Sequence, residues 1–137
     1  MKRSYIAKLG KSDFSKTKRR IQSLLRQIAI LRDKNCVLNR YSITGACSGP
    51  FQAEHLASRS ISISYGDMRN IVLLCQRHHI FWKPQNSRIY WELIEQIIGP
   101  VRWNYIKLVE ADKKPYKMDW LLVEVSLQHQ LSSYEKN

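Results

Sequence analysis

Apolar side chains recur at helical spacing along residues 17–33. They follow the i, i+3, i+4, i+7 rule of a single helix face, at Ile21, Leu24, Leu25, Ile28 and Leu31. Most lysines and arginines of this segment fall outside that stripe. The pattern predicts an amphipathic helix that packs one face on the core and presents a basic face to solvent or DNA.

The residues before this helix show no such period. Residues 1–16 are polar and basic, with scattered glycine and serine, and we expect a flexible basic arm there. A chain of 137 residues has the length typical of one domain, so residues 17–137 are expected to form a single domain.

Residues 36–66 change to a pattern of chain breakers and serines, which favours short strands joined by turns. The breakers are Gly45, Gly49, Pro50 and Gly66. Two short strands are expected, at 51–54 and 71–74, and the second is an apolar run that suits a buried strand.

Helical patterns return after Cys75. Pro84 interrupts the first of them, a stronger helix is expected over 87–98, and Gly99-Pro100 is a stop signal. A further helix is expected over 101–110, and Asp119 suits the N-cap of a last helix through about residue 132. The whole pattern predicts an α+β fold with a C-terminal helical extension over 87–132.

The charge points to a polyanionic partner. The chain has 23 Lys and Arg against 11 Asp and Glu, a formal net charge of +12, and the excess is concentrated in residues 1–34. Nucleic acid is the expected partner, and a merely solvated basic face is the alternative. A membrane surface fits less well, because the basic helix lacks aromatic anchors. No apolar run approaches the roughly 20 residues that span a bilayer, and no signal peptide is recognisable, so we expect a cytoplasmic protein.

The three cysteines are better explained by a metal than by disulfides, because a cytosolic location is expected. Cys75 and His78 have the two-residue spacing that lets both side chains reach one ion, and Cys36 and Cys47 would complete the set. Together they predict a closed Cys3His site for structural Zn²⁺. The alternative is that the cysteines are small buried hydrophobic residues.

A second group suits a harder cation. Glu54 and His79 offer an oxygen and a nitrogen ligand for Mg²⁺ or Mn²⁺, while His55 is placed to act as a base. Neighbours in a regular strand point to opposite faces, so Glu54 and His55 can share a site only where the strand ends. On a helix that starts near residue 76, His78 and His79 lie about 100° apart and can face different metals.

Two further residues complete this group. The Asn70 amide is expected to tie together the loop over residues 56–69 and so to fix how His55 points. Lys83 lies four residues beyond His79 on the same helical face, where it could contact a phosphate.

The ordered set resembles the HNH, or ββα-metal, nucleases, in which a hairpin and a helix surround one metal. It runs Cys36, Cys47, Glu54-His55, Asn70, Cys75 and His78-His79, within residues 32–83. The resemblance implies a zinc-stapled ββα-metal core flanked by the N-terminal amphipathic helix and C-terminal helices. It also implies that His55 is the general base, that Glu54 and His79 hold the catalytic metal, and that products carry 5′-phosphate and 3′-hydroxyl ends.

A narrower resemblance is to the NinG/Rap phage recombination nucleases. It is carried by His55-x3-Arg59, the Asn70 to Cys75 spacing, and Tyr90-Trp91 followed by Ile98-Gly99. It implies a phage or prophage origin, a host cytoplasmic location and branched recombination intermediates as substrate. The sequence departs from the common HNH pattern in having His78 in place of a cysteine, and Cys36 and Cys47 in place of a C-x2-C pair.

We therefore expect a metal-dependent DNA endonuclease that acts on duplex or branched DNA, with His55, Asn70 and His79 as catalytic residues. The expected nucleic-acid contacts are Lys18, Arg19, Arg20, Arg26, Arg59, Arg77 and Lys83. Three alternatives stay open: a non-catalytic zinc-containing DNA-binding module, an RNA-directed or non-specific nuclease, and, ranked low, a homing-type nuclease. A homodimer is also open, because the apolar Leu121, Leu122 and Val125 would either form an interface or complete the core.

Overall fold

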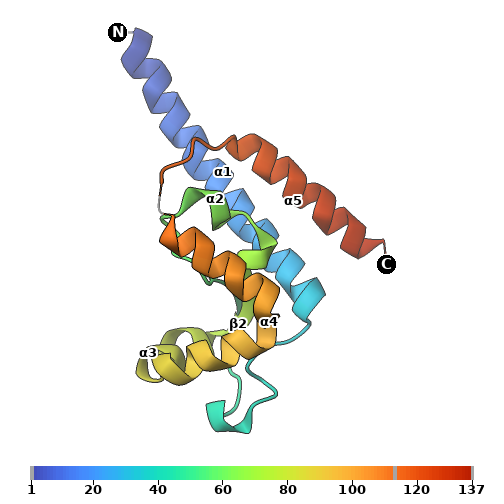
Figure 1. Ribbon diagram of the computed structural model, residues 1–137. Helices are drawn as coiled ribbons and strands as arrows, with labels where there is room; N and C mark the ends of the chain where they lie inside the picture. Colours follow the sequence, from blue (N-terminus) through green and yellow to red (C-terminus); the bar gives the residue numbers. More distant parts are fainter. Residues whose placement is uncertain (1, 113, 137) are drawn as a thin grey trace.

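The computed structural model describes residues 2–112 and 114–136, with side chains from Ser15 onward. A long helix α1 (Lys2–Asp33) crosses the molecule, and the C-terminal helix α5 (Trp120–Glu135) lies along it (Figure 1). Between them the chain forms two short strands and a series of helices. The predicted α+β class is confirmed at this level.

Two strands form the sheet. β1 (Phe51–His55) pairs antiparallel with β2 (Ile71–Cys75), so that Phe51 faces Cys75 and His55 faces Ile71. Both strands lie where the sequence predicts them. Because side chains alternate along a strand, the two faces of the sheet pack against different helices.

One face of the sheet packs against α1. Ala53 and Leu73 join a buried cluster with Ile21, Leu25 and Leu127, the last of which comes from α5. The other face packs against α4 (Ser87–Ala111), in a buried cluster that contains Val72, Leu74, Trp82, Tyr90 and Ile94. The sheet therefore separates two cores, and Phe51, at the start of β1, packs against both of them.

Helix α1 ends at Asp33 as predicted but begins at Lys2. The segment expected to form a flexible arm, residues 1–16, is therefore helical from Lys2 onward. Residues 2–16 contain no proline, and the single Gly10 costs a helix only about 1 kcal/mol. The predicted apolar face is buried except at Leu31, which is exposed, while Ala29 is buried instead.

The break and the cap predicted for the C-terminal helices are both confirmed. Gly99 adopts a φ of 82° inside α4, which breaks it into two segments at the Gly99-Pro100 signal. Asp119 caps α5 by accepting a hydrogen bond from the backbone N–H of Leu122.

Helix α5 faces solvent where its apolar residues were expected to meet a partner or the core. Leu121, Leu122 and Val125 are 63%, 65% and 58% exposed, so they do not complete the core. The buried side chains of α5 are Glu124 and Leu127.

Short helical turns connect these elements. They are η1 (Ser42–Thr44), α2 (Ser62–Tyr65), η2 (Met68–Asn70), the π-helical η3 (Arg77–Trp82) and α3 (Lys83–Gln85). The break predicted at Pro84 is the passage from η3 into α3, whose first turn contains that proline. None of the helices among the described residues combines the length and the apolar character needed to cross a membrane.

Candidate functional site

The four predicted zinc ligands converge. Cys36 follows α1, Cys47 lies in the loop after η1, Cys75 ends β2 and His78 lies in η3. The Nδ1 atom of His78 is 3.0 Å from the Sγ of Cys75, 3.4 Å from that of Cys36 and 3.6 Å from that of Cys47. All four ligand atoms lie within 4.8 Å of one another, and the cysteines are not joined in disulfides.

The geometry fits a tetrahedral zinc ion. Zinc bonds of ordinary length would place sulfur and nitrogen ligands about 3.6 Å apart, close to the separations found here. The Nε2–H of His78 faces the carbonyl oxygen of Thr44 at 3.0 Å, which leaves the Nδ1 lone pair for a metal. Residues 37–46 loop out between Cys36 and Cys47, as the long spacing required.

The three thiols lie close enough to change one another's pKa. Burial and the charge of Cys36 raise the pKa of Cys47 to about 12, and burial also raises the pKa of Cys36. Burial opposes ionisation of Cys75 as well, but hydrogen bonds, the first from the backbone N–H of His78, lower its pKa. A divalent cation would offset the repulsion among three thiolates, so the donor set is compatible with structural zinc.

Arg77 holds the loop around this cluster. Its guanidinium donates to the carbonyls of Thr44 at 2.9 Å and Ala46 at 2.7 Å. Gly45 has a φ of 78°, and a Cβ there would lie 2.8 Å from the guanidinium. Arg77 was expected to contact nucleic acid, and that expectation stays a prediction beside these hydrogen bonds.

A second polar site lies on the neighbouring face of β1. The buried carboxylate of Glu54 meets the Nε2 of His79, from η3, at 2.5 Å, and the ammonium of Lys83, from α3, at 2.7 Å. Burial would raise the pKa of Glu54, but the contacts with His79 and Lys83 outweigh it and the pKa is lowered. Lys83 was expected to reach a phosphate; the structure pairs it with this carboxylate, and the phosphate contact stays a prediction.

Gln52 is a member of this site that the sequence analysis missed. Its Oε1 accepts a hydrogen bond from the Nδ1–H of His79, which directs the Nε2 of that ring toward Glu54. The signal was available, since Gln52 lies two residues before Glu54 and therefore on the same face of the strand. As predicted, His78 and His79 diverge, one toward the cysteines and the other toward Glu54.

His55 has a different environment. Its Nε2–H donates to the carbonyl of Tyr65 at 2.9 Å, and the two rings stack with centroids 4.8 Å apart. The other ring nitrogen, Nδ1, is buried with no hydrogen-bond partner among the described residues. Burial lowers the pKa of His55, so the ring is neutral near pH 7 and Nδ1 holds a lone pair.

The strand alternation continues to the last residue of β1. Glu54 points to η3 and α3, while His55 points to α2, and among the described residues no hydrogen bond or ion pair joins His55 to Glu54 or His79. The link between them is electrostatic, because the Glu54 carboxylate acts to raise the pKa of His55 while Arg59 acts to lower it. The expected shared site is therefore two adjacent polar sites.

Asn70 makes the tie that was predicted for it. Its Oδ1 accepts from the backbone N–H of Ala57 at 2.6 Å, and its Nδ2 donates to the carbonyl of Ser64 at 3.0 Å. Ser64 precedes Tyr65, whose carbonyl holds His55. The buried Asn70 amide thus supports the backbone that orients His55.

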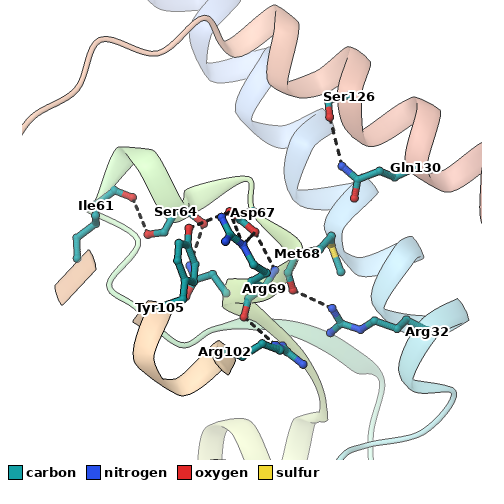
Figure 2. A network of polar contacts seen from close by, with 11 residues as sticks. Arg32, Ile61, Ser64, Asp67, Met68, Arg69, Arg102, Tyr105, Ser126 and Gln130 are labelled. Atoms are coloured by element: carbon teal, nitrogen blue, oxygen red, sulfur yellow. Dashed lines mark hydrogen bonds and ion pairs between the residues drawn. The ribbon is translucent and has the colours of Figure 1, made fainter. Parts of the chain in front are cut away.

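A polar network missed by the sequence analysis supports Asn70 in turn (Figure 2). Asp67 caps η2 by accepting from the backbone N–H of Arg69 at 2.9 Å, and it accepts from the Tyr105 hydroxyl at 2.8 Å. Arg32 and Arg102 both donate to the carbonyl of Ile71, at 2.5 and 2.9 Å. These contacts fix both ends of the segment that carries Asn70.

The basic residues expected to bind nucleic acid divide into two groups. Arg19, Arg26 and Arg59 line one groove together with His79. Arg20 instead forms an ion pair with Glu124 of α5 at 2.8 Å. Lys18 lies 4.7 Å from the ring centroid of Tyr65 and 5.1 Å from that of Trp120.

Comparison of the chain with protein-family models, with curated proteins and with solved structures finds no match.

Proposed function

We propose that this chain is a metal-dependent DNA endonuclease of the HNH type. The observation that supports it most is the meeting of Glu54, from β1, and His79, from the helix η3 that follows β2, beside a Cys3His cluster. One element, η3, provides His78 to the cluster and His79 to the second site. A structural cluster would then hold in place the residue that binds a catalytic cation.

The donors fit a cation such as Mg²⁺ or Mn²⁺. The Oε2 of Glu54 and the Nε2 of His79 converge on one point, and the His79 side chain is 26% exposed, so substrate could approach. A bound divalent ion would supply electrostatic stabilisation of the scissile phosphate and the leaving oxygen. Gln52 orients His79 for this purpose, and Lys83 would have to release the carboxylate.

His55 would act as the general base. Its Nε2–H is committed to the Tyr65 carbonyl, so its Nδ1 is the atom that can take a proton from water. The lowered pKa keeps that nitrogen unprotonated near neutral pH. A small rearrangement, or substrate itself, would have to bring the reacting water within reach of Nδ1.

DNA is the proposed substrate because the net charge of +12 and the arginine-lined groove suit a phosphate backbone. Branched recombination intermediates, a phage origin and a cytoplasmic location extend this proposal on the basis of sequence resemblance alone. A homodimer would use the exposed apolar residues of α5, since paired cuts need two active sites.

Plasmid nicking tests the proposal. Purified zinc-containing protein should convert supercoiled plasmid to the nicked form with Mg²⁺ or Mn²⁺, and His55→Ala should abolish this. Ser133→Ala, an exposed residue of α5, is the matched control and should cut at the wild-type rate. Wild-type protein that leaves the plasmid intact with every divalent metal would contradict the proposal.

A non-catalytic zinc-containing DNA-binding module is the second candidate. It is favoured by the ion pair between Lys83 and Glu54, which satisfies the carboxylate without a metal. This candidate expects DNA binding without cleavage and no binding of Mn²⁺ to zinc-loaded protein. Calorimetric titration with Mn²⁺ distinguishes the two, because the nuclease should bind Mn²⁺ and Glu54→Gln should remove that binding.

A further inference from the structure

A groove of about 690 Å³ is lined by residues of α1 and β1 together with Arg59 and His79. The lining residues of α1 lie on a single helix face, because they recur at helical spacing: Arg19, Gln22, Ser23 and Arg26. The groove therefore includes His79 of the proposed cleavage site.

The apolar part of the lining, called the floor of the groove, consists of Pro50, Phe51, Ala53 and Ile80. Ile80 is 45% exposed, Phe51 is partly buried against both cores, and Ala53 is buried. The backbone of Phe51 is fixed, since its carbonyl accepts a hydrogen bond from the guanidinium of Arg26 at 2.8 Å. Cationic walls over an apolar floor with an aromatic ring suit a ligand that is both anionic and flat.

We propose that this groove binds an unpaired stretch of a DNA strand next to the scissile phosphate. The arginines would contact the phosphates, while bases would lie against Phe51 and Ile80. This inference rests on the proposed nuclease function. It adds that the substrate is unpaired next to the bond that is cut.

We infer an unpaired strand because only its bases have faces that are free to contact the apolar residues of the groove. In a duplex the base faces are stacked on one another, so an apolar floor would meet sugars and phosphates. In an unpaired strand the faces are open, and each base that stacks on a side chain strengthens binding without regard to sequence. The phosphate contacts would be made in either case, so the apolar floor is what discriminates between the two states.

Fluorescence anisotropy with labelled DNA tests this proposal. The full-length zinc-containing protein is titrated, without added divalent metal, with a short single strand, with the blunt duplex of the same sequence and with the equivalent RNA. At about 0.15 M salt, where surface charge is screened, the single strand should bind about fivefold or more tightly than the duplex. Equal or tighter binding of the duplex, or tighter binding of the RNA, would overturn the proposal.

Two variants identify the groove as the source of the preference. Ile80→Ser should lose the single-strand preference and keep duplex affinity, whereas Arg26→Gln should weaken binding of both DNA forms. The control is Val101→Ser, at a residue 82% exposed and outside the groove, which should bind as wild type. An Ile80→Ser protein with a wild-type melting temperature and an unchanged preference would also overturn the proposal.

The outcome is independent of catalysis, because cleavage is not measured. A chain that binds the single strand in the groove but never nicks plasmid would refute the nuclease and keep the groove. A chain that nicks plasmid but shows no single-strand preference would do the reverse.

Discussion

The Cys3His cluster and the Glu54–His79 site share the helix η3 but differ in construction. In the cluster, three sulfurs surround one nitrogen, and Cys36, Cys75 and His78 are buried. At the second site only two donors converge, one of them partly exposed, and a lysine competes for the carboxylate. A closed set of four ligands suits a structural metal, and an incomplete set leaves room for substrate.

The difference also separates what each site does for the fold. The cluster joins the end of α1 and the loop after η1 to the consecutive elements β2 and η3, about 40 and 30 residues further along the chain. The Glu54–His79 site joins β1 to η3 and α3, which the sheet already places together. Loss of the cluster should therefore unfold the protein, while loss of the second site should leave the fold intact.

Cys75→Ser should have the largest effect on stability. It removes the predicted zinc ligand at the end of β2, whose sulfur also accepts a hydrogen bond from the backbone N–H of His78 in η3. The free energy of zinc binding contributes directly to the free energy of folding. We expect a loss of about 4 kcal/mol or more in the free energy of unfolding, together with loss of bound zinc. Thermal unfolding and elemental zinc analysis measure both. Unchanged stability would mean that the cysteines are simply buried hydrophobic residues.

Asn70→Ala should come next. It leaves the buried backbone N–H of Ala57 without its partner and removes one of the donors to the Ser64 carbonyl, which still accepts from the backbone N–H of Asp67. A loss of about 3 kcal/mol is expected, because one buried N–H is left unsatisfied and a second hydrogen bond is lost. Zinc content should not change. The ring signals of His55 in an NMR spectrum should shift, and an unperturbed His55 would show that Asn70 does not position it.

Asp67→Asn should have a smaller, pH-dependent effect. Burial raises the pKa of Asp67, but hydrogen bonds from Arg69 and Tyr105 outweigh it and hold the pKa below its ordinary value of 3.8. The folded protein then binds fewer protons than the unfolded chain, so this stabilisation is present above pH 3.8 and is lost as the pH falls below it.

The substitution should therefore cost about 2 kcal/mol at pH 7 and less at pH 3. Urea unfolding at the two pH values measures the difference. Asp119→Asn is the control, because it removes the carboxylate of an exposed helix cap outside the Asp67 network. If the free energy of unfolding of Asp67→Asn changed with pH as it does in the wild type, Asp67 would not be the source of the acid sensitivity.

Arg77→Met should have the smallest effect. The hydrogen bonds that Arg77 donates to the carbonyls of Thr44 and Ala46, at the edge of the cluster, would be lost. We expect the free energy of unfolding to fall by about 1 kcal/mol. Zinc should dissociate faster on addition of a chelator, while affinity for DNA should stay within error. A variant that keeps its zinc and loses DNA affinity would return Arg77 to the nucleic-acid contacts that the sequence suggested.

Local pattern was enough to predict much of this structure. The helical period of apolar residues predicted α1 from residue 17 onward. The Gly99-Pro100 pair predicted the division of α4, and Asp119 predicted the start of α5. The zinc set was predictable because ligand types are few and the Cys75 to His78 spacing brings two of them together.

What escaped prediction depended on tertiary contacts. Lys83 and Arg77 look like surface cations in the sequence, and their pairing with Glu54 and with the η1 loop is visible only after folding. The apolar residues of α5 suited either an interface or the core in the sequence, yet they are exposed and the buried face of that helix contains Glu124, which pairs with Arg20. The network around Asp67 joins residues from four elements, and no sequence spacing announces it.

The central claim is that a structural cluster and a catalytic site lie side by side and can be separated. One preparation of Glu54→Gln tests it most directly, by measuring zinc content, melting temperature and plasmid nicking together. We predict one zinc per chain, a melting temperature near that of the wild type, and cleavage reduced by about 100-fold or more. A variant that loses its zinc, or that cuts plasmid at the wild-type rate, would contradict the account.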